Sequence, residues 1–278
     1  MRVALAITTL LLAACEPGHE IGIITGEAMG TTYRIKHVGS VDGLDLKPLL
    51  DRLDADLSTW RDDSWVARFN RAPAGEAMMM PQSVRELMAL SQSLHAQTNG
   101  RFDPSIGALL KIWGFGAWQR AFKSEPTNEE VKAAREASGL HLLVVDNGAL
   151  IKARDGVMLD FSAIAKGYAV DRMAEQLITK GCENFIIEFG GDLLARGHAP
   201  GKTSWAVGGP ALEHSITLMN EAIATSGSKH QSRGGKSHVL DPLSGRPVPA
   251  ADPVSARASS CAESDALATA RYVENGAR

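Results

Sequence analysis

The chain has 278 residues, of which 44% are hydrophobic and 22% are charged. These are ordinary values for a globular protein with a substantial core, so they exclude a largely disordered chain and a coiled coil. The formal net charge of -3 disfavours a nucleic-acid-binding protein, because a surface that binds nucleic acid needs clustered basic residues.

The N-terminus has the pattern of an export signal. Arg2 supplies a positive charge, an apolar run extends from Val3 to Leu12, and two alanines precede Cys15. The run is shorter than the ~20 residues that span a bilayer, so cleavage and lipid attachment fit better than a transmembrane helix. We therefore expect a lipoprotein signal peptide over residues 1–14, a lipid on Cys15, and a periplasm-facing protein of the bacterial cell envelope. The other reading is an uncleaved apolar N-terminus.

Two further cysteines, Cys182 and Cys261, lie far apart in the sequence. An oxidising compartment would allow them to pair, but buried free thiols are the simpler interpretation. The chain has no CxxC spacing, so neither a zinc site nor a dithiol redox centre is indicated.

The first half of the chain predicts a strand pair and several helices. Apolar and polar residues alternate over 21–38 around Met29-Gly30, which indicates two paired strands. Helical spacing of leucines over 46–57 and of apolar residues over 84–94 predicts two helices. Thr127 and Glu130 form a capping box for a short helix that ends near residue 139. Asn147-Gly148 then predicts a tight turn between strands 142–145 and 149–151.

The second half mixes one clear helix with short strands. Residues 157–160 read as a strand, and the apolar residues of 169–178 predict a helix that Gly181 ends. Short strands are expected at 185–189, 205–207, 216–219 and 238–240, and a last helix is expected from about Ser264. The order has no strict βαβ alternation and no domain boundary, so the sequence predicts a single compact α+β domain over 15–278.

Three stretches could carry chemistry. Asp160 to Gly167 lies where a strand should enter a helix, and a helix N-terminus with Lys166 could bind a phosphate; a capping aspartate and a solvated lysine are the simpler reading. Asp265 and Thr269 are four apart on one helix face and offer the oxygen ligands that Mg²⁺ prefers, although both could serve only their own helix. His238 on a strand could take a proton, but a lone strand histidine is more often structural.

Glu188 to Asp192 contains paired glycines that would permit close approach to a ligand or simply form a bulge. The chain lacks the common motifs of P-loop NTPases, dinucleotide-binding folds, zincins and α/β-hydrolases.

Many short motifs in register resemble the FAD:protein FMN transferases, the ApbE-type flavin transferases once described as thiamine-biosynthesis lipoproteins. Each motif is weak alone, and together they span most of the chain: 29–33, 57–60, 68–70, 100–104, 113–116, 160–171, 188–192, 224–227, 237–245 and 265–269.

The resemblance implies a T-fold-like α+β domain that uses Mg²⁺ to transfer FMN from FAD to a threonine of an acceptor protein, an exported or membrane-associated redox flavoprotein. AMP would leave. It also implies residues that line the nucleotide site: Met29, Trp60, Arg101, Phe102, Asp103, Asp160 and Lys166. The metal would be held by Ala163 through its carbonyl, Asp265 and Thr269. His238 would be the catalytic base, with Asp241 as its orienter.

Two other functions stay open at this point. The same site with water as acceptor would make the protein an FAD pyrophosphatase, and a protein without turnover would be a flavin-binding lipoprotein. The chain ends at Arg278, soon after the helix of Asp265, where the resemblance implies further strand and helix, so we expect a closing layer to be missing. The polar segment 228–236 also departs from the family pattern, which puts acceptor recognition there in doubt.

Overall fold

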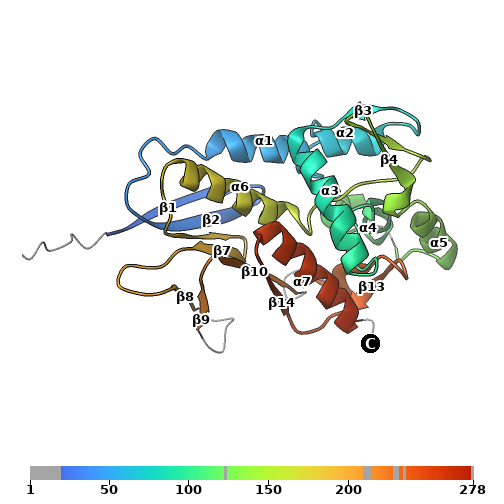
Figure 1. The fold of residues 1–278 in the computed structure, drawn as a ribbon. Helices are drawn as coiled ribbons and strands as arrows, with labels where there is room; N and C mark the ends of the chain where they lie inside the picture. The colour runs from blue at the N-terminus through green and yellow to red at the C-terminus, as the bar shows by residue number, and fades with distance from the viewer. Residues whose placement is uncertain (1–19, 122–123, 209–214, 228–231, 234–235, 277–278) are drawn as a thin grey trace, which may run out of the picture.

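A six-stranded antiparallel sheet forms the centre of the protein (Figure 1). The computed structural model describes residues 20–121, 124–208, 215–227, 232–233 and 236–276. The strands of the central sheet, in spatial order, are β1 (Ile21–Ala28), β2 (Thr31–Val38), β6 (Phe185–Phe189), β7 (Asp192–Arg196), β10 (Glu221–Ser226) and β14 (Val254–Ala258).

Three small sheets surround the central one. Their strands are β3 (Met78–Met79), β5 (Ala149–Lys152) and β4 (Leu143–Asp146) in the first; β11 (Ser232–Arg233), β12 (Lys236–Asp241) and β13 (Arg246–Pro249) in the second; and β8 (Trp205–Val207) with β9 (Ile216–Leu218) in the third.

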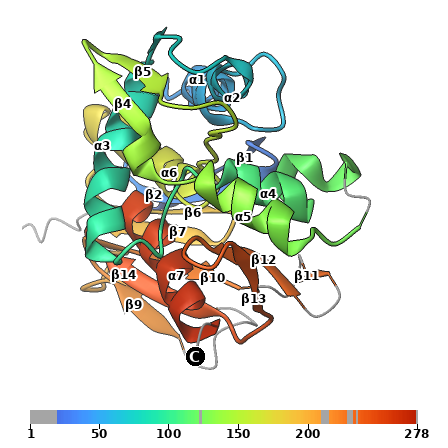
Figure 2. The ribbon, with the colours of Figure 1, turned by 90° about the vertical axis from the view of Figure 1, so that its right-hand side faces the viewer.

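The helices of the described residues are α1 (Lys47–Leu57), α2 (Trp65–Arg71), α3 (Gln82–Gln97), α4 (Gly107–Trp113), α5 (Asn128–Glu136), α6 (Ala165–Thr179) and α7 (Cys261–Gly276), with 3₁₀ turns at Gly116–Ala121 and Leu140–Leu142. They cover one face of the central sheet or extend beyond it (Figures 1 and 2).

The main core lies between the central sheet and helices α6 and α7. Ile35, Phe185 and Phe189 point from the sheet into it, and Val170 and Ala266 meet them from the two helices. On the opposite face, the β8–β9 hairpin packs Trp205 and Leu218 against residues of β6, β7 and β10. The sheet is therefore sandwiched, and the helix-covered face carries the large core.

Most elements agree with the sequence predictions. Met29 and Gly30 have φ of 48° and 78°, the left-handed values that a tight β1–β2 turn requires, and Asn147 and Gly148 make the same turn between β4 and β5. Thr127 and Glu130 form the predicted capping box. The predicted α+β domain is confirmed.

Two boundary predictions are wrong. Residues 157–160 do not form a strand: Met158 makes one isolated bridge with Ile106, two backbone hydrogen bonds join the segment to Pro104 and Gly107, and the Asn70 side chain pairs with Leu159. The last helix begins at Cys261 rather than near Ser264, because Asp171 on α6 accepts hydrogen bonds from the Cys261 and Ala262 amides and caps it.

Cys182 and Cys261 are both free and buried, which confirms the simpler interpretation of these thiols. Burial raises the pKa of each thiol, so both favour the protonated, unreactive form. None of the described helices is long and apolar enough to cross a bilayer.

Candidate active site

Two carboxylates and one ammonium group form a buried cluster between α6, α7 and β7. Lys166 Nζ lies 3.0 Å from Asp265 Oδ2 and 3.0 Å from Asp192 Oδ2. The two carboxylate side chains are 3% and 6% exposed, whereas the lysine side chain keeps 31% of its surface open. The cluster is thus buried on the carboxylate side and accessible on the lysine side.

The charges in this cluster are unbalanced, because two carboxylates share one ammonium group. Burial and the neighbouring Asp265 raise the pKa of Asp192 to about 7. Burial opposes the charge of Lys166, but the two carboxylates outweigh it and raise the pKa of the ammonium group. Asp192 Oδ2 is buried and accepts no directed hydrogen bond among the described residues. One positive charge therefore serves two buried negative charges, and a further cation would relieve the excess.

Glycines allow the elements of the cluster to approach closely. Gly190 has φ of 59° in the turn between β6 and β7, and a Cβ there would lie 3.0 Å from Thr31 and 3.4 Å from Lys166 Cδ. A Cβ on Gly167 would lie 2.3 Å from the Cys261 carbonyl oxygen, so only glycine lets α6 cross α7 at this distance. The predicted role of the paired glycines was ligand approach or a bulge; here they form a tight turn beside Lys166.

Asp160 lies at the start of the segment that leads to Lys166. Its Oδ1 accepts a hydrogen bond from the Ser162 amide at 2.8 Å, and the Thr59 hydroxyl donates to Oδ2 at 3.4 Å. Burial raises the pKa of this carboxyl. Asn70 pairs with both backbone groups of Leu159, at 2.7 and 2.8 Å, and so imitates a neighbouring strand. This side chain fixes the segment that the sequence reads as a strand.

The remaining predicted metal ligands are near the cluster in the fold. Thr269 is one helical turn after Asp265 on α7, and its hydroxyl is 2.9 Å from the Ser226 hydroxyl at the end of β10. Ala163 lies in the turn just before α6 and packs partly against the main core. Among the described residues, no three His, Cys, Asp or Glu side chains gather as a metal site, so protein ligands would have to include a hydroxyl or carbonyl oxygen.

His238 and Asp241 are on β12, which packs beside α7. Val239 and Val248 contact Tyr272 and Val273 of that helix, so α7 joins this small sheet to the cluster. Asp241 accepts hydrogen bonds from the Leu243 and Ser244 amides, and its carboxylate therefore holds the turn after β12. Its predicted role as orienter of His238 stays a prediction.

The residues predicted to line the nucleotide site differ in accessibility. Trp60 is 68% exposed and could stack on a planar ring, and Met29 lies in the β1–β2 turn. Arg101 is partly exposed. Phe102 is 2% exposed and belongs to the main core cluster, and its place in the nucleotide site stays a prediction.

Asp103 lies in a second hollow, of about 230 Å³, that is lined also by His95, Arg135 and His141. Its carboxylate accepts hydrogen bonds from Ser105 and lies 3.5 Å from His95 Nδ1. The backbone amide of Asp160 donates a hydrogen bond to the carbonyl of Pro104, the residue after Asp103, at 2.7 Å. Asp160 and Asp103 are therefore close to each other in the fold.

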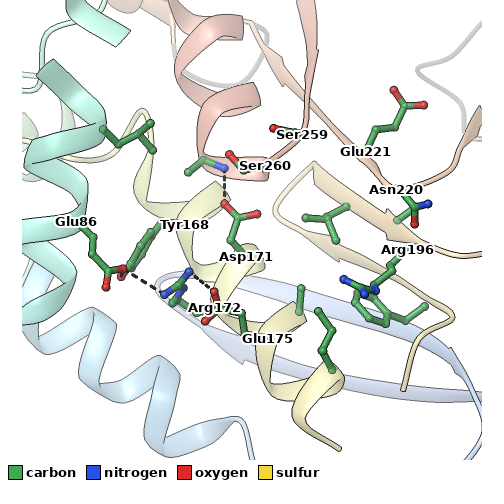
Figure 3. A pocket seen from close by; sticks show the side chains of 17 residues that line it. Glu86, Tyr168, Asp171, Arg172, Glu175, Arg196, Asn220, Glu221, Ser259 and Ser260 are labelled. Carbon is green, nitrogen blue, oxygen red and sulfur yellow. Dashed lines mark hydrogen bonds and ion pairs between the residues drawn. The ribbon is translucent and has the colours of Figure 1, made fainter. Parts of the chain in front are cut away.

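A cavity of about 600 Å³ lies at the other end of β7 (Figure 3). Asp192 begins β7 in the cluster, whereas Arg196 ends β7 in this cavity. Figure 3 shows Asp171 reaching the N-terminus of α7, and Arg172 between Glu86 and Glu175. The side chains in this cavity are thus engaged with one another, and the chemistry predicted from the sequence lies elsewhere.

A buried acidic pair on a lysine, with a hydroxyl and a helix entrance beside it, is typical of an enzyme that binds an anionic ligand together with a cation. The chain belongs to the ApbE family, which it matches over residues 29–278.

Its relatives support this assignment. The FAD:protein FMN transferase of Vibrio cholerae is 34% identical over 98% of this chain and 86% of its own length. The crystal structure of a flavinyl transferase ApbE from Pseudomonas stutzeri, an apo form, has 37% identity and a TM-score of 0.83 over 92% of this chain and 84% of that one. The Thermotoga maritima ApbE protein has 28% identity and a TM-score of 0.82, covering 92% of this chain and 88% of that one.

Three residues of the site were not predicted as functional. Asp192 lies within a motif of the resemblance, but only the fold shows that it shares Lys166 with Asp265. Asn70 and Asp171 also lie within motifs of the resemblance, but their hydrogen bonds to distant backbone groups become visible only in the fold.

Proposed function

We propose that this chain transfers the FMN half of FAD to a threonine hydroxyl of an acceptor protein in a Mg²⁺-dependent reaction that releases AMP. The contact of Lys166 with both Asp192 and Asp265 carries the proposal, together with membership of the ApbE family. The carboxylates of this cluster suit a cation, and the ammonium group of Lys166 suits a phosphate. FAD brings a pyrophosphate to such a site.

The residues present fit a magnesium ion. The buried carboxylates of Asp192 and Asp265 share one ammonium group, that of Lys166, at 3.0 Å each, so the cluster has an excess of negative charge that a cation would balance. Asp265, Thr269 and the carbonyl of Ala163 would hold the ion, and hard oxygen donors of this kind suit it. When bound, Mg²⁺ supplies charge neutralisation at the pyrophosphate oxygens.

The protein residues have separate tasks in the transfer. The acceptor oxygen forms a bond to the phosphorus of the FMN half, the bond from that phosphorus to the AMP oxygen breaks, and AMP leaves with the electron pair. His238 takes the proton of the acceptor hydroxyl, with Asp241 near it on the chain. Lys166, once released from the carboxylates, contacts a phosphate oxygen. The nucleotide is positioned by the residues that the resemblance indicates: Met29, Trp60, Arg101, Phe102, Asp103 and Asp160.

The proposal includes the place of the enzyme in the cell. Lipid attached to Cys15 after removal of residues 1–14 would hold the domain on the periplasmic side of a bacterial membrane, where exported flavoproteins are its acceptors. The apolar run, the two alanines and the cysteine at the start of the sequence support this.

Intact mass of an acceptor domain with a target threonine tests the activity. We expect an FMN adduct after incubation with the protein, FAD and Mg²⁺, no adduct with EDTA, and none with Asp265→Ala. Asp252→Asn, which removes an exposed carboxylate, is the matched control and should transfer like the parent.

The products distinguish the alternatives. AMP and free FMN at a comparable rate, without an adduct, would favour the pyrophosphatase. FAD binding without Mg²⁺ and without either product would favour the binding protein. Transfer by His238→Ala at the parent rate would refute the assignment of the base.

A further inference from the structure

On one face of the central sheet, β1 and most of β2 extend beyond the β8–β9 hairpin, although Val38 at the end of β2 packs partly against the cluster under that hairpin. The register of β1 and β2 pairs Ile21 with Val38 and Ile23 with Lys36, so these side chains project to the same side. The alternate residues, among them Ile24 and Ile35, face the main core. The first set is therefore the outer face of this edge of the sheet.

The outer face is apolar and exposed where β1 begins. Ile21 is 44% exposed and Ile23 is 53% exposed. Over β6, β7 and β10 the same side of the sheet is covered by the β8–β9 hairpin, with Trp205 buried against it. Ile21 and Ile23, which are two residues apart and lie on the same face of β1, are therefore not covered by the hairpin that buries the residues of β6, β7 and β10.

Basic residues stand beside these isoleucines. Lys36 is opposite Ile23 and Arg34 is opposite Thr25, and both basic side chains are exposed. Glu27 is farther along β1, toward the Met29 turn. Arg34 has the carboxylate of Glu188 opposite it on β6, so Lys36 is the basic side chain that stands beside the isoleucines without an acidic residue opposite it. The start of the strand pair therefore presents an apolar surface with a basic side chain next to it, which suits an anionic lipid surface.

The chain length from Cys15 makes a bilayer the nearest occupant. Six residue steps separate Cys15 from Ile21, and an extended chain covers about 20 Å in that length. A lipid on Cys15 would hold Ile21 within that distance of the headgroups. We propose that the outer face of β1 and β2 around Ile21, Ile23, Arg34 and Lys36 lies on the membrane surface and orients the domain. This inference rests on the lipid attachment proposed above.

A fluorescent probe on a single thiol tests the contact in the full lipidated chain. Ile23→Cys is labelled with an environment-sensitive dye, and Met79→Cys, 65% exposed on β3, is the matched control. Cys182 and Cys261 are buried, so the new thiol takes the label. Both proteins are reconstituted into vesicles of phosphatidylcholine and phosphatidylglycerol, with and without quencher-bearing lipids.

We expect the probe at position 23 to shift to shorter wavelength and to be quenched by the labelled lipids, and the probe at 79 to remain as in water. Arg34→Glu with Lys36→Glu should lower the quenching at 23 at least twofold, whereas Lys132→Glu, an exposed change on α5, should not.

Three results would overturn the inference. A protein whose mass includes the lipid, but whose probe at 23 behaves like that at 79, would refute the contact alone. A mass without lipid on Cys15 would refute the attachment and this inference with it. If the probe at position 23 keeps its short-wavelength emission in detergent and the protein has the mass of a dimer, the face is covered by a second copy of the chain.

Discussion

Asp192→Asn should make the metal-free protein more stable at alkaline pH while it impairs activity. The change keeps the shape of a buried side chain and removes one of the two negative charges that share Lys166. Because the pKa of Asp192 is raised by burial and by Asp265, the folded protein disfavours the ionised carboxylate.

The sign and size follow from this pKa. It rises from 3.8 to about 7 on folding. A raised carboxyl pKa contributes fully to stability below the unfolded value and loses that contribution as pH rises through the folded value. The loss between about pH 4 and pH 7 is about 4 kcal/mol at most, since each unit corresponds to ~1.4 kcal/mol. Asparagine does not ionise, so the variant escapes this loss.

Thermal unfolding in EDTA measures the effect. At about pH 8 we expect the variant to melt several degrees above the parent, because ~1 kcal/mol shifts the midpoint of a protein of this size by about 2–4 °C. At about pH 4 the two should melt alike. Addition of Mg²⁺ should stabilise the parent more than the variant, and FMN transfer by the variant should fall.

Asp252→Asn is the control, since it removes the same charge from an exposed position. If Asp192→Asn melts below the parent by the same amount at both pH values, the reasoning is refuted. The Asp192 side chain would then stabilise the fold at both pH values, and burial would not make its ionised form destabilising.

Three further changes test how the backbone holds the site. Gly167→Ala places a methyl group 2.3 Å from the Cys261 carbonyl oxygen, and we expect a loss of about 1–3 kcal/mol in calorimetry with reduced transfer; unchanged melting would contradict the crossing distance. Asn70→Ala leaves both backbone groups of Leu159 unpaired and should cost about 2–3 kcal/mol in urea unfolding, whereas parent-like unfolding would show that water replaces the amide. Asp171→Ala removes the cap of α7 and should cost about 1–2 kcal/mol, seen as faster amide exchange in the first turn of that helix; unchanged exchange there would show that the cap is dispensable.

Local patterns in the sequence predicted the fold class, the longer helices and about half of the strands, but not β7, β10 and β14 of the central sheet. Turn pairs such as Met29-Gly30 and Asn147-Gly148 favour positive φ angles and so predict tight turns. Apolar residues at helical spacing predict helices that pack on a core. The central sheet was not predictable in the same way, since its order joins β2 to β6 and β10 to β14 across long intervals of chain.

The site was predictable only in part for the same reason. Asp160, Lys166 and Asp265 lie in motifs, so the resemblance points to them. The strand predicted at 157–160 fails because Asn70 satisfies the backbone of Leu159 in place of a neighbouring strand. Phe102 is in a motif and is buried in the main core, and the motif alone did not indicate that burial.

The contact between Lys166 and Asp265 joins residues 99 positions apart in the chain, and Thr59 reaches Asp160 across 101. Helix α7 follows every other element that contributes to the cluster. During synthesis, Lys166 therefore emerges long before Asp265, and no fragment that ends before α7 contains both residues. The chain can therefore complete the cluster of Lys166, Asp192 and Asp265 only after α7 has been synthesised and has packed against α6.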